Sequence, residues 1–241
     1  MTHRSGTPEI TGTGGAESGS VPAAFVDVDE TLVRSVTFLS LFSFDARRRG
    51  RGAEADAVIE EFRALRAAGM SRGESHRWFY RHWSGRDVAD LGHVGREWFA
   101  SRAADPAFFN IAVRRRLAEL SRAGSRIVLV SGSFAPALCP IAEAVGATSV
   151  LCTSLATAAG KYTGEVLATM VGADKSAALH RYAEEAAIDL SSCAAFGDHH
   201  SDVAMFELVG HPVVVGDADP RLHGYPAQRL PGWTAPVSRG S

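Results

Sequence analysis

Two short segments of the sequence each contain a pair of closely spaced aspartates. The segment DVDET contains Asp27 and Asp29, and the segment GDHHSD contains Asp198 and Asp202. Carboxylates that face one another repel unless a cation lies between them, and a hard divalent ion with oxygen ligands, most naturally Mg²⁺, removes that conflict. If a phosphate ester binds next to the ion, one aspartate can attack its phosphorus atom and form an aspartyl-phosphate. A second aspartate can protonate the oxygen of the leaving group and later deprotonate water.

Two further segments contain groups that can hold a phosphate. In VLVSGS, Ser131 and Gly132 follow an apolar run, and in GADKS, Lys175 opens a helical stretch. A hydroxyl, a backbone N–H and an ammonium group can bind phosphate oxygens and stabilise the charge that develops in the transition state. The chain contains only one other lysine, Lys161, and a positive charge at a helix start is unfavourable unless an anion lies nearby. Together the four segments suit phosphoryl transfer.

Alternating strand and helix patterns predict how these distant segments could meet. Short apolar runs predict strands at residues 23–28, 126–130, 148–151, 193–196 and 212–215, with a hairpin at 160–167. Helical patterns at residues 106–122, 135–145 and 174–187 separate them, with Pro106 in the first turn of the first of these helices. This alternation predicts an α/β fold with a Rossmann-like, doubly wound parallel sheet, whose strands carry active residues at their carboxyl ends.

The region between the first strand and residue 105 has another pattern. Apolar residues fall at helical spacing, and the segment RRRGRG at residues 47–52 separates two helical stretches. We therefore expect an all-helical cap at residues 35–105, inserted into a core formed by residues 21–34 and 106–241. Residues 1–20 are rich in Gly, Ser and Thr, which predicts a disordered tail, and the proline-rich stretch from Tyr225 predicts irregular structure.

In order and separation the four segments resemble the motifs of the haloacid dehalogenase (HAD) superfamily, in particular its phosphoserine-phosphatase-like branch. The DxDxT motif corresponds to residues 27–31, the strand-end serine to Ser131, the lysine to Lys175 and the GDxxxD motif to residues 197–202. The helical region follows the first motif, where this branch carries its cap. The resemblance extends over residues 23–222.

The resemblance implies a role for each carboxylate. Asp27 would be the nucleophile and Asp29 the general acid/base. The carboxylates of Asp27 and Asp198 and the backbone carbonyl of Asp29 would hold Mg²⁺, which Asp202 would support directly or through a water molecule. Thr31 would shape the turn after Asp29.

The resemblance also implies how the phosphate is held and what the protein does. Ser131, the N–H of Gly132 and Lys175 would bind phosphate oxygens. The expected function is a Mg²⁺-dependent phosphatase that hydrolyses a small-molecule phosphomonoester, a biosynthetic metabolite phosphate, through an aspartyl-phosphate. Alternatives are a phosphotransferase that passes the phosphoryl group to an alcohol and a non-catalytic protein that binds a phosphorylated metabolite.

Features of the sequence narrow the substrate. Within the superfamily that the sequence resembles, carbon–halogen hydrolases lack the second aspartate because a halide leaving group needs no proton, so Asp29 favours phosphate esters. Members that cleave phosphonates need an additional cap lysine, and the helical region contains none. Phosphoserine phosphatases carry a glutamate a few residues after the first motif, whereas residues 34–38 (RSVTF) contain no acid. The substrate is therefore not expected to be phosphoserine.

Some residues outside the motifs are candidates for substrate contacts. Trp78 and His82 are four residues apart on a helical stretch, and His199 directly follows a motif aspartate. The alternative is that Trp78 and His82 belong to the core and that His199 faces solvent. The arginines of residues 47–51 suggest a solvated turn, with a second anionic group of the substrate as the alternative.

Composition excludes several other classes of protein. The formal net charge of −2 leaves no positive excess for nucleic-acid binding, and no apolar run approaches the ~18–20 residues that span a bilayer. The N-terminal stretch lacks the apolar region of a secretory signal, so we expect a cytoplasmic protein without a membrane partner. The odd number of widely spaced cysteines, Cys139, Cys152 and Cys193, indicates small buried side chains and no disulfide or zinc site. The sequence does not indicate the oligomeric state.

Overall fold

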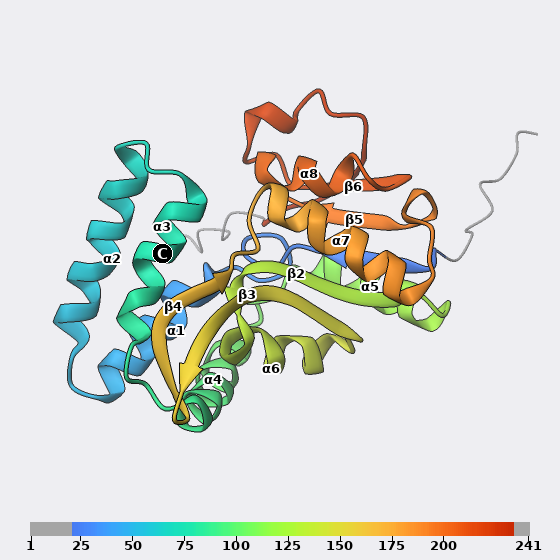
Figure 1. Cartoon of the computed structure of the whole chain (residues 1–241). Coiled ribbons are helices and arrows are strands. Elements are labelled where there is room, and N and C mark those ends of the chain that lie inside the picture. The colour runs from blue at the N-terminus through green and yellow to red at the C-terminus, as the bar shows by residue number, and fades with distance from the viewer. Residues whose placement is uncertain (1–20, 234–241) are drawn as a thin grey trace, which may run out of the picture.

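A computed structural model describes residues 21–233, and a seven-stranded sheet lies at its centre (Figure 1). The strand order is β4-β3-β2-β1-β5-β6-β7, and all neighbouring pairs are parallel except the antiparallel pair β3/β4. The strands are β1 (Ala23–Val26), β2 (Arg126–Phe134), β3 (Ser149–Ala158), β4 (Lys161–Ala168), β5 (Ala194–Gly197), β6 (His211–Val215) and β7 (Gln228–Leu230). The expected α/β fold is confirmed.

Helices cover both faces of the sheet because its central strands are apolar on both sides. In β1, Ala24 and Val26 pack into one hydrophobic cluster and Ala23 and Phe25 into another. The first cluster includes side chains from α1 (Thr37–Arg48), α4 (Val88–Ala103), α5 (Ile111–Arg122) and α6 (Ala135–Val145). The second includes side chains from α7 (Ala173–Ala186) and α8 (Val203–Phe206). Burial on both faces explains the continuous apolar runs of these strands.

Residues 37–103 contain the expected helices, with α2 (Gly52–Ala67) and α3 (Arg72–Tyr80) between α1 and α4. Figure 1 shows α2 and α3 beyond one end of the sheet, whereas α6 and α7 lie along its faces. The break between α1 and α2 falls at residues 49–51, inside the predicted arginine-rich turn. Phe79, Trp83 and Trp98 of this region share one hydrophobic cluster with the sheet, so the helices and the sheet pack on a common core.

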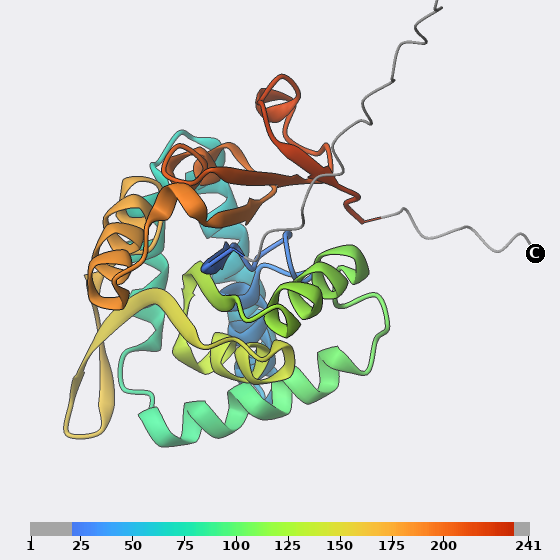
Figure 2. The same ribbon diagram turned by 90° about the vertical axis from the view of Figure 1, so that its right-hand side faces the viewer.

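The hairpin of β3 and β4 stands out from the sheet, as Figure 2 shows in yellow, and joins the helical region. The N–H of Tyr162 in β4 donates to the carbonyl of Arg86 at 2.9 Å, and the N–H of Gly85 donates to the carbonyl of Tyr162 at 2.8 Å. These bonds attach the segment between α3 and α4 to the sheet.

Several local predictions are wrong in detail. The helix predicted at residues 106–122 begins at Ile111, because Asn110 accepts hydrogen bonds from the N–H groups of Ala112 and Val113 and so caps it; Pro106 lies before it. The tail expected to be irregular contains β7, which pairs with β6.

The three cysteines are free, as expected, but they are not all buried. Cys193 is buried, Cys152 is half-buried and Cys139 is exposed. The predicted disordered tail at residues 1–20 lies outside the described residues. Within residues 21–233, no helix combines the length and the apolar character needed to cross a membrane.

Candidate active site

The aspartate segments meet because β1 and β5 are neighbours in the sheet. Asp27 and Asp29 follow β1, and Asp198 and Asp202 follow β5. The N–H of Asp27 donates to the carbonyl of Phe196 at 2.9 Å, which holds the two strand ends side by side. Parallel strands present their carboxyl ends at the same edge of a sheet, so this meeting follows from the fold.

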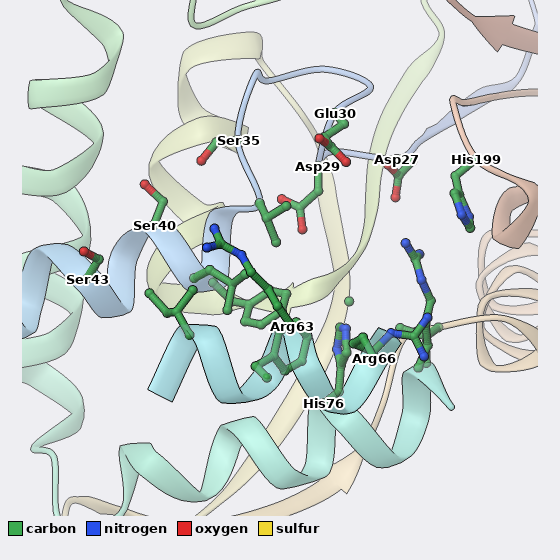
Figure 3. A pocket seen from close by; sticks show the side chains of 18 of the residues that line it. Asp27, Asp29, Glu30, Ser35, Ser40, Ser43, Arg63, Arg66, His76 and His199 are labelled. Carbon is green, nitrogen blue, oxygen red and sulfur yellow. The ribbon is translucent and has the colours of Figure 1, made fainter. Parts of the chain in front are cut away.

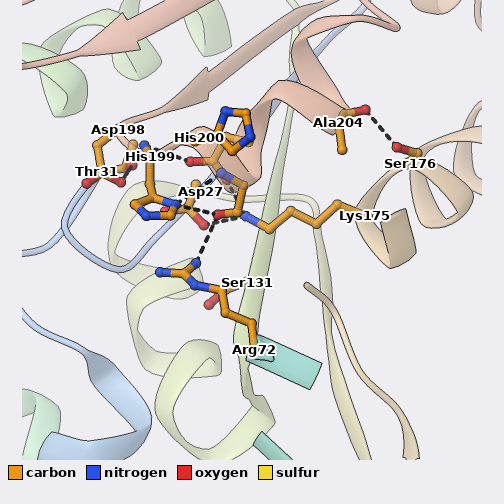
Figure 4. Close-up of polar contacts among 12 residues, drawn as sticks. Asp27, Thr31, Arg72, Ser131, Lys175, Ser176, Asp198, His199, His200 and Ala204 are labelled. Carbon is orange, nitrogen blue, oxygen red and sulfur yellow. Dashed lines mark hydrogen bonds and ion pairs between the residues drawn. The ribbon is translucent and has the colours of Figure 1, made fainter. Parts of the chain in front are cut away.

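Lys175 joins two of these aspartates across the site (Figure 4). Its Nζ donates to Asp27 Oδ1 at 2.6 Å and to Asp202 Oδ1 at 2.7 Å, and all three residues are buried. Burial acts to lower the pKa of Lys175, but Asp202 and Asp27 outweigh burial and raise it, so the ammonium group stays charged. Lys175 lies in the first turn of α7, and these carboxylates stabilise its charge there.

Asp27, Asp198 and Asp202 form a compact carboxylate cluster, in which one oxygen of each lies within 4.8 Å of the others. Burial and then Asp202 raise the pKa of Asp198 to about 7, and burial raises the pKa of Asp27 well above its usual range. Thr31 Oγ1 donates to Asp198 Oδ1 at 2.8 Å, so Thr31 orients a carboxylate in addition to its place in the turn. Three carboxylates this close together, two of them buried, are a donor set that suits Mg²⁺.

A glycine allows this cluster to be so compact. A Cβ atom at Gly197 would lie 2.5 Å from the Cβ of Asp202 and 2.6 Å from its carboxylate carbon. Asp202 is also held by the backbone N–H of His199, which donates to its Oδ2 at 3.2 Å. The GDxxxD spacing therefore folds Asp202 back over the strand end.

Asp29 lies in a different environment from the cluster. Its Oδ1 accepts a hydrogen bond from the N–H of Thr37, the first residue of α1, at 2.8 Å. Burial raises the pKa of Asp29 to about 6. The next residue, Glu30, has a φ of 65°, a left-handed conformation that is uncommon for a non-glycine residue and that turns the chain sharply after Asp29. A carboxyl group with this pKa can exchange protons near neutral pH.

Ser131 and Gly132 lie inside β2 and not directly after a strand as predicted, because the strand continues to Phe134, and residues from other elements hold them there. Ser131 is buried, and its Oγ accepts a hydrogen bond from the N–H of Ser133 at 3.0 Å. The carbonyl of Gly132 accepts hydrogen bonds from the hydroxyls of Tyr80 at 2.9 Å and Thr153 at 2.8 Å. Helix α3 and strand β3 thus position the expected phosphate-binding segment.

The aspartates lie at one side of a cavity of about 880 Å³ (Figure 3). Asp27, Asp29, Asp198 and Lys175 line it, as do apolar side chains that include Phe38 and Phe62. In Figure 3, Arg63 and Arg66 of α2 and His76 of α3 lie across the cavity from Asp27 and Asp29. A cavity of this size can enclose a small molecule.

His199, a predicted substrate contact, is among the residues that line the cavity. Its Nδ1 accepts a hydrogen bond from the N–H of Ser201 at 3.0 Å, and its Nε2 lies 3.0 Å from an Arg221 nitrogen. Burial lowers the pKa of His199, which favours the neutral ring. The ring of His199 thus accepts a hydrogen bond from within the turn that carries the GDxxxD motif.

Trp78 and His82 do not line the cavity, contrary to the expected substrate contacts. Their rings pack against each other at 5.0 Å, and Trp78 is packed against the hydrophobic cluster. The face of α3 that meets the cavity carries His76 instead. Trp78 lies two positions further along the helix, so its side chain points to a different side of the helix.

His76, Arg66 and Arg72 line the cavity and were missed by sequence reasoning. The ring of His76 packs so close that a Cβ atom at Gly132 would lie 2.7 Å from its Cε1. Burial lowers the pKa of His76 to about 4. Arg47 also lines the cavity but pairs with Asp56 at 2.8 Å. Amphipathic spacing on α2 and α3 was the available signal, but the inner face could not be identified without the packing.

Comparisons with known proteins found a matching family model and related proteins. The family model described as haloacid dehalogenase-like hydrolase matches residues 24–207. "Probable phosphatase Rv3661" from Mycobacterium tuberculosis is 29% identical over 208 residues, which cover 84% of this chain and 71% of that protein.

Two solved structures share the fold. A Bordetella pertussis protein with unknown function has a TM-score of 0.77 at 19% identity and covers 88% of this chain and 99% of its own. A substrate-bound phosphoserine phosphatase has a TM-score of 0.63 at 21% identity and covers 89% of this chain and 94% of its own.

Proposed function

This chain belongs to the haloacid dehalogenase-like hydrolases, and from that premise we propose that it hydrolyses a small-molecule phosphomonoester. One observation carries the proposal. Asp27 lies in a buried cluster with Asp198 and Asp202, contacts Lys175 at 2.6 Å and lines a cavity of about 880 Å³. A carboxylate nucleophile, a cation for the phosphate and room for a small molecule therefore occur together.

The proposed reaction has two steps. Asp27 attacks the phosphorus atom, and the bond from phosphorus to the alcohol oxygen breaks while Asp29 gives its proton to that oxygen. Asp29 then takes a proton from a water molecule that attacks the aspartyl-phosphate. This step regenerates the Asp27 carboxylate and releases inorganic phosphate. The pKa of Asp29, raised to about 6 by burial, suits a group that must both give and take a proton.

The remaining residues of the site hold the transferring group. Lys175, the hydroxyl of Ser131 and the N–H of Gly132 would bind phosphate oxygens and stabilise the charge of the transition state. Mg²⁺ would be held by the carboxylates of Asp27 and Asp198 and the backbone carbonyl of Asp29, with Asp202 in support. The ion, when bound, supplies positive charge that offsets the repulsion between the phosphate dianion and the carboxylates.

The cavity favours a substrate that is larger than phosphoserine and has an apolar part. Ser35 and Val36 line it at the position where phosphoserine phosphatases are expected to carry an acid, and Phe38, Phe62 and Trp98 contribute apolar surface. Helices α2 and α3 would act as the cap that keeps water out during transfer.

Phosphate release from a panel of phosphomonoesters with Mg²⁺ tests the proposal. Turnover should disappear in the Asp27→Asn variant and with EDTA, and it should persist in Asp217→Asn, which makes the same change at an exposed position outside the cavity. A parallel assay with a polyol acceptor separates hydrolysis from transfer to an alcohol. Absence of turnover with every ester, in protein shown to be folded, would overturn the proposal.

A further inference from the structure

The cavity is lined by more cationic side chains than are needed to bind one phosphate group beside the aspartates. Among the residues that the structure describes, five arginines from four helices line it, apart from Lys175. They are Arg47 of α1, Arg63 and Arg66 of α2, Arg72 of α3 and Arg102 of α4. Two of them have a carboxylate partner on α2, since Arg47 pairs with Asp56 at 2.8 Å and Arg63 with Glu60 at 2.6 Å.

Arg66 and Arg72 line the cavity without such a partner among the described residues. Within residues 21–233, no ion pair joins either residue to a carboxylate; Arg66 donates to the carbonyl of Met70, and Arg72 donates to Ser201 Oγ at 2.9 Å. Both interactions are with neutral oxygens, so they orient the guanidinium groups and leave their charge uncompensated.

The two guanidinium groups lie close enough to affect each other. Burial and then the charge of Arg72 lower the pKa of Arg66. Behind the larger effect of burial, Arg72 also lowers the pKa of His76 and of His199. Neighbouring cations repel, and a bound anion relieves that repulsion. Arginine also presents paired N–H donors that match a carboxylate or a phosphate.

We propose that Arg66 and Arg72 bind a second anionic group of the substrate, which is then a phosphomonoester with a carboxylate or another phosphate group at a distance from the ester. This inference rests on the proposed phosphatase function and names its substrate class. Lys175 is already bound to Asp27 and Asp202 at the aspartate side, whereas Arg66 lies across the cavity (Figure 3). Apolar residues such as Phe38 and Phe62 line the same space and suit the body of such a molecule.

Three matched series of linear alkyl phosphates test the inference, and within each series the chain length varies. The far end carries a hydroxyl in the first series, a carboxylate in the second and a phosphonate in the third. The wild-type protein should show at least a tenfold higher kcat/KM for an alkyl phosphate that ends in a carboxylate or a phosphonate than for the alkyl phosphate of equal length that ends in a hydroxyl. The second and third series distinguish which anion is preferred.

Substitution of Arg66 separates this role from phosphate binding at the reaction site. Arg66→Gln should lower kcat/KM for the anionic esters at least tenfold more than for the matched hydroxyl ester, and Arg72→Gln should show the same selectivity. Arg77→Gln, an exposed change on α3 outside the cavity, is the control and should change no ratio. Equal losses on all three series would overturn the inference and assign the arginines to the transferring phosphate or to the fold.

Binding measured without turnover provides a second readout. Calorimetry with the Asp27→Asn protein should detect the anionic ester, and Arg66→Gln in that background should weaken its binding at least tenfold. The two proposals fail in different ways. Hydrolysis of simple esters without preference for an anionic end contradicts only this inference, whereas folded protein that hydrolyses no ester contradicts the proposed function.

Discussion

Lys175 and Asp27 form a buried ion pair of 2.6 Å between residues 148 positions apart in the sequence. The same ammonium group contacts Asp202 at 2.7 Å, so one lysine of α7 links the strand ends of β1 and β5. Removing one partner of a buried pair leaves charge without compensation. Lys175 and Asp27 should therefore contribute to the stability of the fold as well as to the proposed reaction.

Lys175→Met should destabilise the protein by about 3–5 kcal/mol, because two buried carboxylates lose their common cation. Urea unfolding followed by circular dichroism, with EDTA present, measures the effect. Lys161→Met is the matched control, since Lys161 is the other lysine of the chain and is exposed on β4. Similar unfolding midpoints for the two variants would contradict the role given to the ion pair.

Mg²⁺ should stabilise the folded protein independently of turnover. A ligand that binds only the folded state at about a hundredfold excess over its Kd adds about 3 kcal/mol of stability. Thermal unfolding with and without Mg²⁺ measures this, and Asp198→Asn should abolish the shift. Asp189→Asn, a change at a residue outside the cavity, should retain it. A shift that survives in Asp198→Asn would place the ion elsewhere.

Asp29→Asn should affect esters according to their leaving group. Alkyl phosphates need a proton on the departing oxygen, so their turnover should fall by about 10²–10⁴-fold. An aryl phosphate with an acidic leaving group can still phosphorylate Asp27, but without Asp29 to activate water the aspartyl-phosphate should accumulate. Mass spectrometry after an acid quench detects the modified Asp27. An equal fall on both esters without any accumulated intermediate would argue against the assignment.

Gly132→Ala should disturb the contact between β2 and α3. The added Cβ atom would lie 2.7 Å from His76 Cε1 and 2.8 Å from Val171 Cγ1, and overpacking of this kind costs about 1–3 kcal/mol. A double-mutant cycle with His76→Ala, measured by urea unfolding, tests the cause. Part of the loss should be recovered in the double variant; simple additivity would show that His76 is not the obstacle.

His76 should make the stability depend on pH in a defined window. Burial lowers its pKa from 6.5 to about 4, and the positive charge of Arg72 acts in the same direction. Below pH 6.5 the unfolded chain binds a proton that the folded chain resists, so folding stability should fall between pH 6.5 and 4 and stay unaffected by His76 above that range. The full shift corresponds to about 3 kcal/mol.

The difference in unfolding free energy between wild type and His76→Asn isolates this contribution from that of the carboxylates. Arg66 and Lys175 also lower the pKa of His76, and they are present in both proteins. The wild type should lose stability relative to the variant as the pH falls toward 4. Parallel pH profiles would show that His76 is protonated equally in both states.

The sequence alone determined the features that depend on local patterns. The apolar runs of β1, β2 and β5 predicted buried parallel strands, and α6 begins and ends at Ala135 and Val145 as predicted. Strand-end motifs and their order were sufficient to predict which segments meet, because a parallel sheet places its carboxyl ends at one edge. The same motifs, in the same order, also indicated the family.

Helix and strand boundaries that rest on side-chain contacts were not predicted as well. Asn110 caps α5 and excludes Pro106 from it, and the hydrogen bonds to β6 stabilise β7 in a stretch that looked irregular. A cap needs one side chain turned toward free N–H groups, and an edge strand needs a neighbour. Neither condition is visible in composition.

Only the tertiary structure decided which face of α3 meets the cavity. His76 faces the site and Trp78 packs against the hydrophobic cluster, although both lie on the same short helix. The same packing decided that Arg66 and Arg72 face the cavity without a carboxylate partner in residues 21–233, whereas Arg63 pairs with Glu60. Sequence spacing specifies how side chains are arranged around one helix, but the direction in which that helix is rotated depends on the elements packed against it.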